Sequence, residues 1–401
     1  MTNANPRGML KENSRASLPE ADAAALAASH ALSQLIRAEI AALGGWITFS
    51  RFMELALYQP GLGYYSGGAR KFGAGGDFIT APELTPLFAQ TLAAQAAQVM
   101  AKSSRQILEA GAGSGALAAD LLLELEQQGT LPDRYLILEI SADLRRRQGE
   151  TLNSRAPHLA PRVAWLEHLP ESFSGLVLGN EVLDAMPVAL LVWRDEDEMQ
   201  GIFERGVALG GDSNFVWQER PAASPLLAAA ERLPVVAAYL SEIGLTGAAW
   251  VSEWGRILQQ GAILLFDYGF PRREYYLPER DCGTLMCHYR HHSHGDPFWL
   301  PGLNDLTAHV DFTAVAEAGF EAGLDVLGYA TQAQFLLNCG ITGLLERLQE
   351  SSDQAYLGEA RKVGKLISPA EMGELFKVII LGRGISEPLL GFSCGDRLHS
   401  L

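Results

Sequence analysis

A glycine-rich turn between a short apolar strand and a helix constrains the fold of this chain most. In the stretch ILEAGAGSGALAADLL, three glycines stand at Gly111, Gly113 and Gly115. Glycine lets backbone N–H groups approach a ligand closely, because no Cβ stands in the way and positive φ is allowed. The helix predicted from about Ala116 points its positive end at the same place. The pattern therefore predicts a site that favours a phosphate or a carboxylate.

Two nucleotide cofactors are compatible with this turn. Gly111, Gly113 and Ala116 satisfy the dinucleotide pattern GxGxxG/A. Glu109 with the three glycines gives the ExGxGxG run that is usual in S-adenosylmethionine (SAM) methyltransferases. The next predicted strand, RYLILEIS, contains Glu139 near its end, and an acidic side chain there suits the ribose diol of either cofactor. A turn without a ligand is the third alternative, and the turn alone does not choose among the three.

Predicted strands alternate with predicted helices along most of the chain. RVAWLE, GLVLGNEV and GAILLFDYG are strand candidates that follow the Arg-rich helix after RYLILEIS, which implies a parallel sheet. Two more, FEAGLDVLGYAT and LFKVIILGRG, lie on either side of a helical region at 331–373. A closing pair of strands fits the methyltransferase sheet, whose last strand is antiparallel. We therefore expect an α/β fold of the class I SAM-methyltransferase (Rossmann-like) type, with an N-terminal helical extension and a helical insertion.

The same survey predicts three parts of the chain. Residues 1–20 form a polar tail, because charged residues interrupt them and no amphipathic stripe is present. Residues 21–100 form a helical and loop cap over the cofactor, including a long segment rich in glycine and proline. Residues 101–401 form the methyltransferase core, with a helical insertion at about 221–260.

Composition excludes several classes of protein. A chain of 401 residues with 48% hydrophobic content buries a large core, as one elaborated domain or two. The formal net charge of −16 argues against nucleic acid as a partner. No apolar run reaches the length of a membrane span, and the first 20 residues lack the apolar core of a signal peptide, so we expect a cytoplasmic protein. The four cysteines show no CxxC spacing, so we expect reduced thiols.

The segment LGNEVLDAMPV carries the candidate catalytic groups. Asn180 and Glu181 come at the carboxyl end of a predicted central strand, where open α/β sheets bind their ligands. Asp184 follows one turn later. In a SAM enzyme these side chains would lie beside the transferred methyl group and hold the nucleophile. The alternative is a helix cap, in which Asn180 or Asp184 accepts bonds from nearby N–H groups.

Seven segments together resemble one known family, the MidA-like SAM-dependent methyltransferases. They are GLGYYS, RKFGAGGDFITAPELTPLF, LEAGAGSGALAADLL, GNEVLDAMPV, LLFDYGFP, GTLMCHYRHHSHGDPF and DLTAHVDF. The resemblance runs from about residue 45 to 385. The family includes the mitochondrial assembly factor that methylates an arginine of a core complex I subunit. The resemblance therefore implies a protein arginine methyltransferase that uses SAM, supports assembly of respiratory complex I and has as its partner a protein with a target arginine.

The resemblance also implies roles for particular residues. SAM would be bound by Glu109, Gly111, Gly113, Gly115, Glu139 and Asn180, with Asp77, Phe78, Thr80 and Glu83 closing over it. Glu181 and Asp184 would face the substrate. The chain has NEVLDAMP where the family more often shows an aromatic pair after the glutamate, which affects the acceptor pocket and not the SAM site.

The chemistry of arginine methylation explains why carboxylates are expected there. The guanidinium is protonated at any accessible pH and has no free lone pair. A pair such as Glu181 with Asp184, or Glu181 with Glu83, could hold the guanidinium fork and leave one nitrogen more nucleophilic.

The segment DCGTLMCHYRHHSHGD raises a metal site as an alternative. Its cysteines and histidines do not have the CxxC or HxxxH spacing of common zinc sites, so we expect no metal and favour a histidine-lined substrate pocket. Imidazoles there can accept the proton released on methylation, and His309 is the catalytic candidate. His309 forms an oriented pair with Asp311, or Asp311 caps the following helix; both alternatives stay open.

Two other functions remain open at this point. The chain could methylate a small molecule with SAM, or it could be an assembly factor that binds SAM without catalysis. Self-association into a homodimer is also left open by the sequence.

Overall fold

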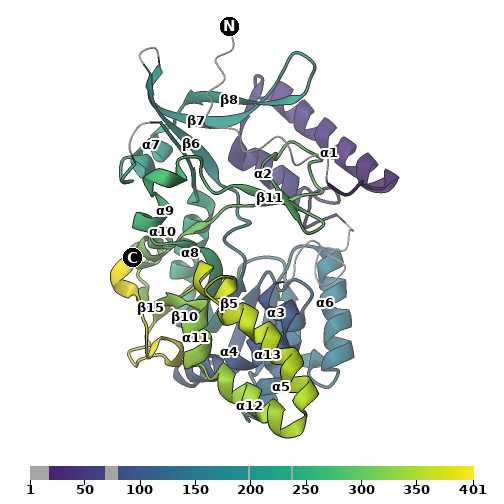
Figure 1. The fold of residues 1–401 in the computed structure, drawn as a ribbon, viewed down its shortest axis with the longest axis vertical. Coiled ribbons are helices and arrows are strands. Elements are labelled where there is room, and N and C mark those ends of the chain that lie inside the picture. Colours follow the sequence, from purple (N-terminus) through teal and green to yellow (C-terminus); the bar gives the residue numbers. More distant parts are fainter. Residues whose placement is uncertain (1–17, 68–79, 197–198, 236–237) are drawn as a thin grey trace. The chain divides into compact units, whose positions relative to one another are not determined.

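The computed structural model describes residues 18–67, 80–196, 199–235 and 238–401 (Figure 1). These residues form two compact units. The first unit takes its described residues from 1–71, 185–247 and 272–309. The second takes them from 72–184, 248–271 and 310–401.

An eight-stranded sheet forms the centre of the second unit. Its strands are β2 (Gln106–Ala110), β3 (Arg134–Leu138), β4 (Val163–Leu166), β5 (Phe173–Asn180), β10 (Leu258–Phe270), β14 (Val310–Asp311), β15 (Asp325–Thr331) and β16 (Phe376–Arg383). The order is β15-β16-β10-β5-β2-β3-β4, with β14 paired to β10. Neighbours from β10 to β4 are parallel, while β16 is antiparallel to both β10 and β15. The predicted α/β sheet with an antiparallel last strand is therefore confirmed.

The topology of this sheet locates a ligand site. From β2 the chain continues through β3 and β4 on one side, and then returns to place β5 on the other side of β2. Open α/β sheets bind ligands at such a reversal, beyond the carboxyl ends of the strands. The glycine turn follows β2 and the segment NEVLD follows β5. Both predicted site segments therefore start at the same edge of the sheet, from neighbouring strands.

Helices cover this sheet as the predicted alternation requires. They are α3 (Ala81–Leu84), α4 (Pro86–Lys102), α5 (Ala116–Gln127), α6 (Ala142–Arg155), α10 (Phe312–Glu321), α11 (Gln332–Asn338), α12 (Ile341–Ser351), α13 (Asp353–Ile367) and α14 (Met372–Leu375). Single 3₁₀ turns are η2 (Ala160–Arg162), η4 (Leu390–Phe392) and η5 (Leu398–Ser400). α4 packs on β5 and β10 and also contacts α12 and α13 (Figure 1). The helical region predicted at 331–373 is confirmed.

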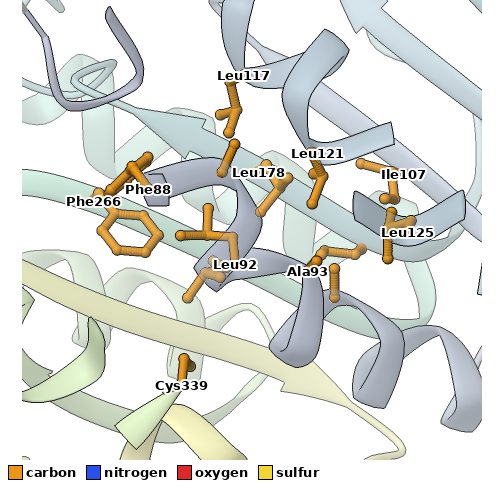
Figure 2. Packing of buried hydrophobic residues seen from close by; sticks show 14 of the residues in the cluster. Phe88, Leu92, Ala93, Ile107, Leu117, Leu121, Leu125, Leu178, Phe266 and Cys339 are labelled. Carbon is orange, nitrogen blue, oxygen red and sulfur yellow. The ribbon is translucent and has the colours of Figure 1, made fainter. Parts of the chain in front are cut away.

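The core of the second unit is the contact of α4 and α5 with the sheet (Figure 2). Phe88 and Leu92 recur at the spacing of one helical turn and point from α4 to the same side. The ring of Phe88 meets that of Phe266 on β10 at 5.3 Å between centroids. Leu117, with Leu121 and Leu125 at the same spacing, gives α5 its buried face. This packing holds the N-terminus of α5 directly after β2 and the glycine turn.

The first unit contains two sheets and a helical layer. Its helices are α1 (Ala23–Ala42), α2 (Phe49–Tyr58), α7 (Ser224–Ala230) and α9 (Arg272–Tyr275), with a 3₁₀ turn η3 (Pro278–Arg280), and α8 (Leu245–Ile257) leads on into the second unit. One sheet contains β1 (Trp46–Thr48), β6 (Ala189–Glu196), β7 (Met199–Leu209), β8 (Phe215–Pro221) and β9 (Tyr239–Ile243). The other contains β11 (Met286–Tyr289), β12 (His292–His294) and β13 (Asp305–Thr307). Buried side chains of α1 and α2 form one core with residues of both sheets.

This division differs from the predicted domain boundaries. Within the predicted cap of residues 21–100, α3 and α4 belong to the second unit. Residues 185–247, expected in the core, instead join the N-terminal helices through an antiparallel sheet. The predicted helical insertion at 221–260 contains α7 and α8 but also strand β9. The physical reason is that strand pairing joins residues far apart in sequence, such as Trp46 with Ala208, and local periodicity does not record such pairs.

The described residues also contain no helix with both the length and the apolar character needed to cross a bilayer.

Candidate functional site

The glycine turn adopts a conformation that requires its glycines. The φ angles of Gly111, Gly113 and Gly115 are 66°, 51° and 84°, in the region that side chains disfavour. A Cβ on Gly115 would also lie 3.0 Å from the Cα of Gln148 on α6. Gly115 is the N-cap residue of α5 and has no side chain to cap it. The N–H of Ala116 donates to Oγ of Ser114 at 3.3 Å, and the positive end of the helix favours an anionic ligand at the turn.

Glu109 is a buried carboxylate in β2. The residue is 2% exposed, and its Oε2 accepts a hydrogen bond of 2.6 Å from the hydroxyl of Tyr135. Burial raises the pKa of Glu109 to about 7, although the bond from Tyr135 opposes the rise. Its described contacts therefore place it within the sheet beneath the turn, and its role in binding SAM stays a prediction.

Glu139 directly follows β3 and is held by two donors. Its Oε1 accepts from the backbone N–H of Ser141 at 2.8 Å, and its Oε2 accepts from Nε2 of Gln148 at 3.2 Å. Burial raises the pKa of Glu139, and these two hydrogen bonds oppose the rise. A carboxylate oxygen accepts more than one bond, so each retains capacity for a ribose hydroxyl.

Ile140 is a site candidate that the sequence analysis missed. It follows Glu139 in the loop after β3 and is 66% exposed, which makes it one of the most exposed large hydrophobic side chains of the described residues. An apolar surface next to the carboxylate expected to bind the ribose suits the flat face of a nucleobase. The signal was an isoleucine directly after the acidic residue that follows the strand.

The predicted closing segment is described only in part. Asp77 and Phe78 lie outside the described residues. Thr80 is the half-buried N-cap residue of α3, with no capping hydrogen bond from its side chain. Glu83 accepts a hydrogen bond from the hydroxyl of Ser114 in the glycine turn, so α3 is attached directly to the turn.

The segment after β5 has a strained backbone. Glu181 has φ of 54°, which costs a non-glycine residue of this kind about 1–3 kcal/mol and points to a constraint from its surroundings. Its N–H donates to the carbonyl of Phe266 at 2.8 Å. Nδ2 of Asn180 donates to Oε1 of Glu181 at 2.9 Å. The Oδ1 atom of Asn180 is buried and accepts no hydrogen bond from the described residues, so it is available to a ligand donor.

Asp267 on β10 holds this segment in place and was missed by the sequence analysis. Its Oδ2 accepts from the backbone N–H groups of Val182, Leu183 and Asp184 at 3.1, 2.9 and 3.3 Å. Asp267 is 1% exposed and Asp184 is 5% exposed. Burial and the nearby carboxylates of Asp184 and Glu181 raise the pKa of Asp267 well above its usual range. The three carboxylates therefore form one interacting cluster.

The helix-cap interpretation of this segment is wrong. No helix begins in the fully described stretch between Asn180 and β6, so neither Asn180 nor Asp184 caps one. The N–H groups that a cap would satisfy bond to Asp267 instead. The reason is that Asp267 comes from a neighbouring strand and offers a better placed acceptor than the local side chains.

His309 belongs to the first unit, whereas Glu181 and Asp184 belong to the second. Its backbone N–H donates to Oγ1 of Thr284 at 3.0 Å. Asp311 caps α10, since its Oδ1 accepts from the N–H groups of Thr313 and Ala314 at 3.0 and 3.1 Å. The cap alternative for Asp311 is confirmed, and the catalytic role of His309 stays a prediction.

The cysteine- and histidine-rich segment forms the hairpin of β11 and β12. Cys287 is buried in the core of the first unit. Nε2 of His294 lies 3.1 Å from Oδ1 of Asn304. Burial, with a contribution from His294, lowers the pKa of His288 to about 4. In the part of the chain that the structure describes, no three His, Cys, Asp or Glu side chains are grouped to hold a metal ion.

Comparison with known proteins identifies the class of this site. Residues 87–330 match the model of the family described as "Putative S-adenosyl-L-methionine-dependent methyltransferase". A crystal structure of a "likely methyl transferase" from Burkholderia thailandensis bound to S-adenosyl-homocysteine is 52% identical, with a TM-score of 0.92, and the match covers 96% of this chain and 100% of that one.

Curated relatives match over most of their length. The mitochondrial protein arginine methyltransferase NDUFAF7 of Danio rerio is 30% identical over 368 residues, which are 83% of this chain and 82% of the relative. The mitochondrial NDUFAF7 homolog of Drosophila melanogaster is 28% identical over 413 residues, which are 94% of this chain and 91% of the relative.

The chain belongs to this family of SAM-dependent methyltransferases, and its fold is the class I methyltransferase fold. Within that class it is a MidA-like protein, as the seven segments predict, and SAM is its cofactor. The structure independently fits SAM through the glycine turn, Glu139 with the exposed Ile140, and the buried free oxygen of Asn180. The family assignment, and not the turn itself, decides for SAM over the dinucleotide and empty-turn alternatives.

Proposed function

We propose that this chain is a protein arginine N-methyltransferase that supports assembly of respiratory complex I. One observation supports it above the others: the acidic cluster of Glu181 and Asp184, which directly follow β5, with Asp267 on the neighbouring strand β10. The strand β5 lies next to β2, which leads into the glycine turn. The names of the NDUFAF7 relatives support the same acceptor. The partner is then a protein with a target arginine, and we propose that it is a complex I subunit met in the cytoplasm.

Clustered carboxylates provide the negative charge and the hydrogen-bond acceptors that bind a guanidinium. Bound SAM supplies a methyl group activated by the positive charge on its sulfur. Glu181 and Asp184 accept N–H bonds from one side of the guanidinium, which localises positive charge there and leaves the other nitrogen more nucleophilic. Asn180 donates to Glu181 and so limits the directions from which that carboxylate can accept a bond.

The same cluster of carboxylates also serves as the base of the reaction. As the nitrogen–carbon bond forms, the carbon–sulfur bond breaks and its electron pair stays on sulfur, while the attacking nitrogen must lose one proton. A carboxylate in a buried group of like charges accepts a proton readily, because protonation relieves their repulsion. We assign this step to the cluster.

Labelled SAM distinguishes this proposal from two alternatives, a small-molecule methyltransferase and an assembly factor without catalysis. Tritiated SAM is incubated with the protein and a cell lysate, and the protein and small-molecule fractions are then counted. Label on protein arginine supports the proposal, label in small molecules indicates a metabolite methyltransferase, and no label indicates an assembly factor without catalysis. Mass spectrometry of arginine methylation in cells with and without the protein then identifies the target.

Variants of the carboxylates test the mechanism separately from SAM binding. Asp184→Asn keeps the size of the side chain but removes its charge, so methyl transfer falls by roughly one to several orders of magnitude while SAM binds as before. Glu181→Gln has the same effect. Equal losses of SAM affinity and turnover would assign Asp184 to the cofactor or the fold, and full activity of both variants would refute the guanidinium-holding role.

A further inference from the structure

A single amide on α6 connects two parts of the predicted cofactor site. Gln148 is fully buried. Its Nε2 donates to the carbonyl of Gly113 at 3.1 Å and to Oε2 of Glu139 at 3.2 Å. Its Oε1 accepts from the indole N–H of Trp165 at 2.8 Å. These contacts link the glycine turn after β2 to the carboxylate after β3.

The orientation of this amide is determined by its partners. The indole of Trp165 can only donate, so the oxygen of Gln148 must face it. Both N–H bonds of Gln148 are then directed at acceptors, Gly113 and Glu139. Close packing also fixes the position of Gln148. A Cβ on residue 115 would lie 3.0 Å from the Cα of Gln148, so only glycine at 115 allows this approach.

From these contacts we propose that Gln148 is a positioning residue of the SAM site. It fixes the distance between the glycine turn and Glu139, and it keeps a donor on Glu139 that favours the ionised, diol-accepting form. Gln148 acts through Glu139 and Gly113 and does not need to touch SAM. The proposal rests on SAM being the cofactor and on Glu139 binding the ribose, and it is independent of arginine as the methyl acceptor.

Replacing the amide by a carboxylate gives a pH-dependent test. In Gln148→Glu the new side chain faces Glu139 and the carbonyl of Gly113, and when ionised it repels both. Arg145 is the charged group that also acts on Glu139, and its own partner is Glu167. At pH 8 we expect SAM affinity of the variant to be about 10- to 100-fold weaker than wild type, which corresponds to the loss of a bond to a charged group. As pH falls toward 5, the pair formed by the new carboxyl group and Glu139 takes up a proton. This proton restores one of the two donors and relieves the repulsion, so the affinity of the variant rises toward that of wild type.

Two further variants separate charge from shape. Gln148→Met keeps the length of the side chain and loses both donors, so its affinity falls at pH 8, and lowering the pH does not restore it. Gln128→Glu is the matched control, because Gln128 also donates to a carboxylate, Glu124, but at the C-terminal end of α5. SAM affinity of the control should equal that of wild type at every pH.

Calorimetric titration with SAM and with S-adenosylhomocysteine measures these affinities, and thermal unfolding without ligand reports on the fold. A positioning role predicts a raised KM for SAM with kcat preserved at saturation. An affinity of Gln148→Glu equal to wild type at pH 8, or a loss that is the same at pH 5 and pH 8, would overturn the proposal. Unfolding of both Gln148 variants would assign the residue to the fold instead, which also overturns it. These experiments measure SAM binding and not methyl transfer. A negative result for Gln148 would therefore not argue against arginine as the methyl acceptor. Conversely, a failure to methylate arginine would not argue against the positioning role of Gln148.

Discussion

Replacing Glu109 by Gln should stabilise the protein at neutral and alkaline pH. Glu109 is buried in β2, and the hydroxyl of Tyr135 is the hydrogen-bond donor recorded for its carboxylate. Glutamine has nearly the same shape and keeps an oxygen that accepts this bond. The substitution therefore removes the cost of a buried charge and keeps the packing.

The size and sign of the effect follow from the pKa. Burial raises the pKa of Glu109 from 4.5 to about 7 in the folded protein. Below pH 4.5 both states are protonated and there is no cost. Between pH 4.5 and 7 the unfolded chain releases a proton that the folded protein retains, so stability falls as pH rises. Above pH 7 the full cost is present, roughly 3 kcal/mol for a shift of this size.

Urea unfolding of wild type and Glu109→Gln across pH 4 to 9 checks this prediction. The difference in unfolding free energy should be near zero at the acid end, rise through pH 4.5 to 7 and then level off. Titrations of other groups cancel in the difference. Glu124→Gln is the control, because Glu124 is also buried but contacts Gln128 and Arg347. It should show no such gain, and a flat difference for Glu109→Gln would refute the reasoning.

Three further substitutions test the cofactor site and the segment after β5. Gly113→Val places a branched side chain at φ of 51°, so the SAM affinity measured by calorimetry should fall steeply. Unchanged SAM binding by a folded variant would show that the turn has only a structural role. Glu139→Ala should weaken SAM binding by about 1.5–3 kcal/mol per lost bond, and the melting temperature should also fall because Ser141 and Gln148 lose their acceptor. Normal SAM binding by the folded fraction of the variant would assign Glu139 to a purely structural network. Asp267→Ala leaves three backbone N–H groups without their acceptor, so stability should fall by at least about 1–3 kcal/mol and methyl transfer should fall more than SAM affinity. A stable, active Asp267→Ala protein would show that the segment is held by other contacts.

The sequence alone determined the features that depend on local backbone chemistry. Three glycines at alternate positions predicted a turn that only glycine can form, and their positive φ angles agree with it. The alternation of strands and helices predicted the parallel sheet and its antiparallel last strand. The same local patterns placed Glu139 and Glu181 at the ends of strands, because a strand and the turn after it are both encoded within about ten residues.

Only the tertiary structure decided which distant residues support these groups. Gln148 looks like one polar residue in an Arg-rich helix, and Asp267 looks like the polar end of an apolar strand. Asp267 lies more than 80 positions from the segment whose N–H groups it accepts, and 35 positions separate Gln148 from Gly113. The antiparallel sheet of the first unit likewise pairs Trp46 with Ala208. Hydrogen bonds and strand pairs of this kind depend on how the chain returns through the sheet, and a periodicity measured along the sequence contains no information about that return.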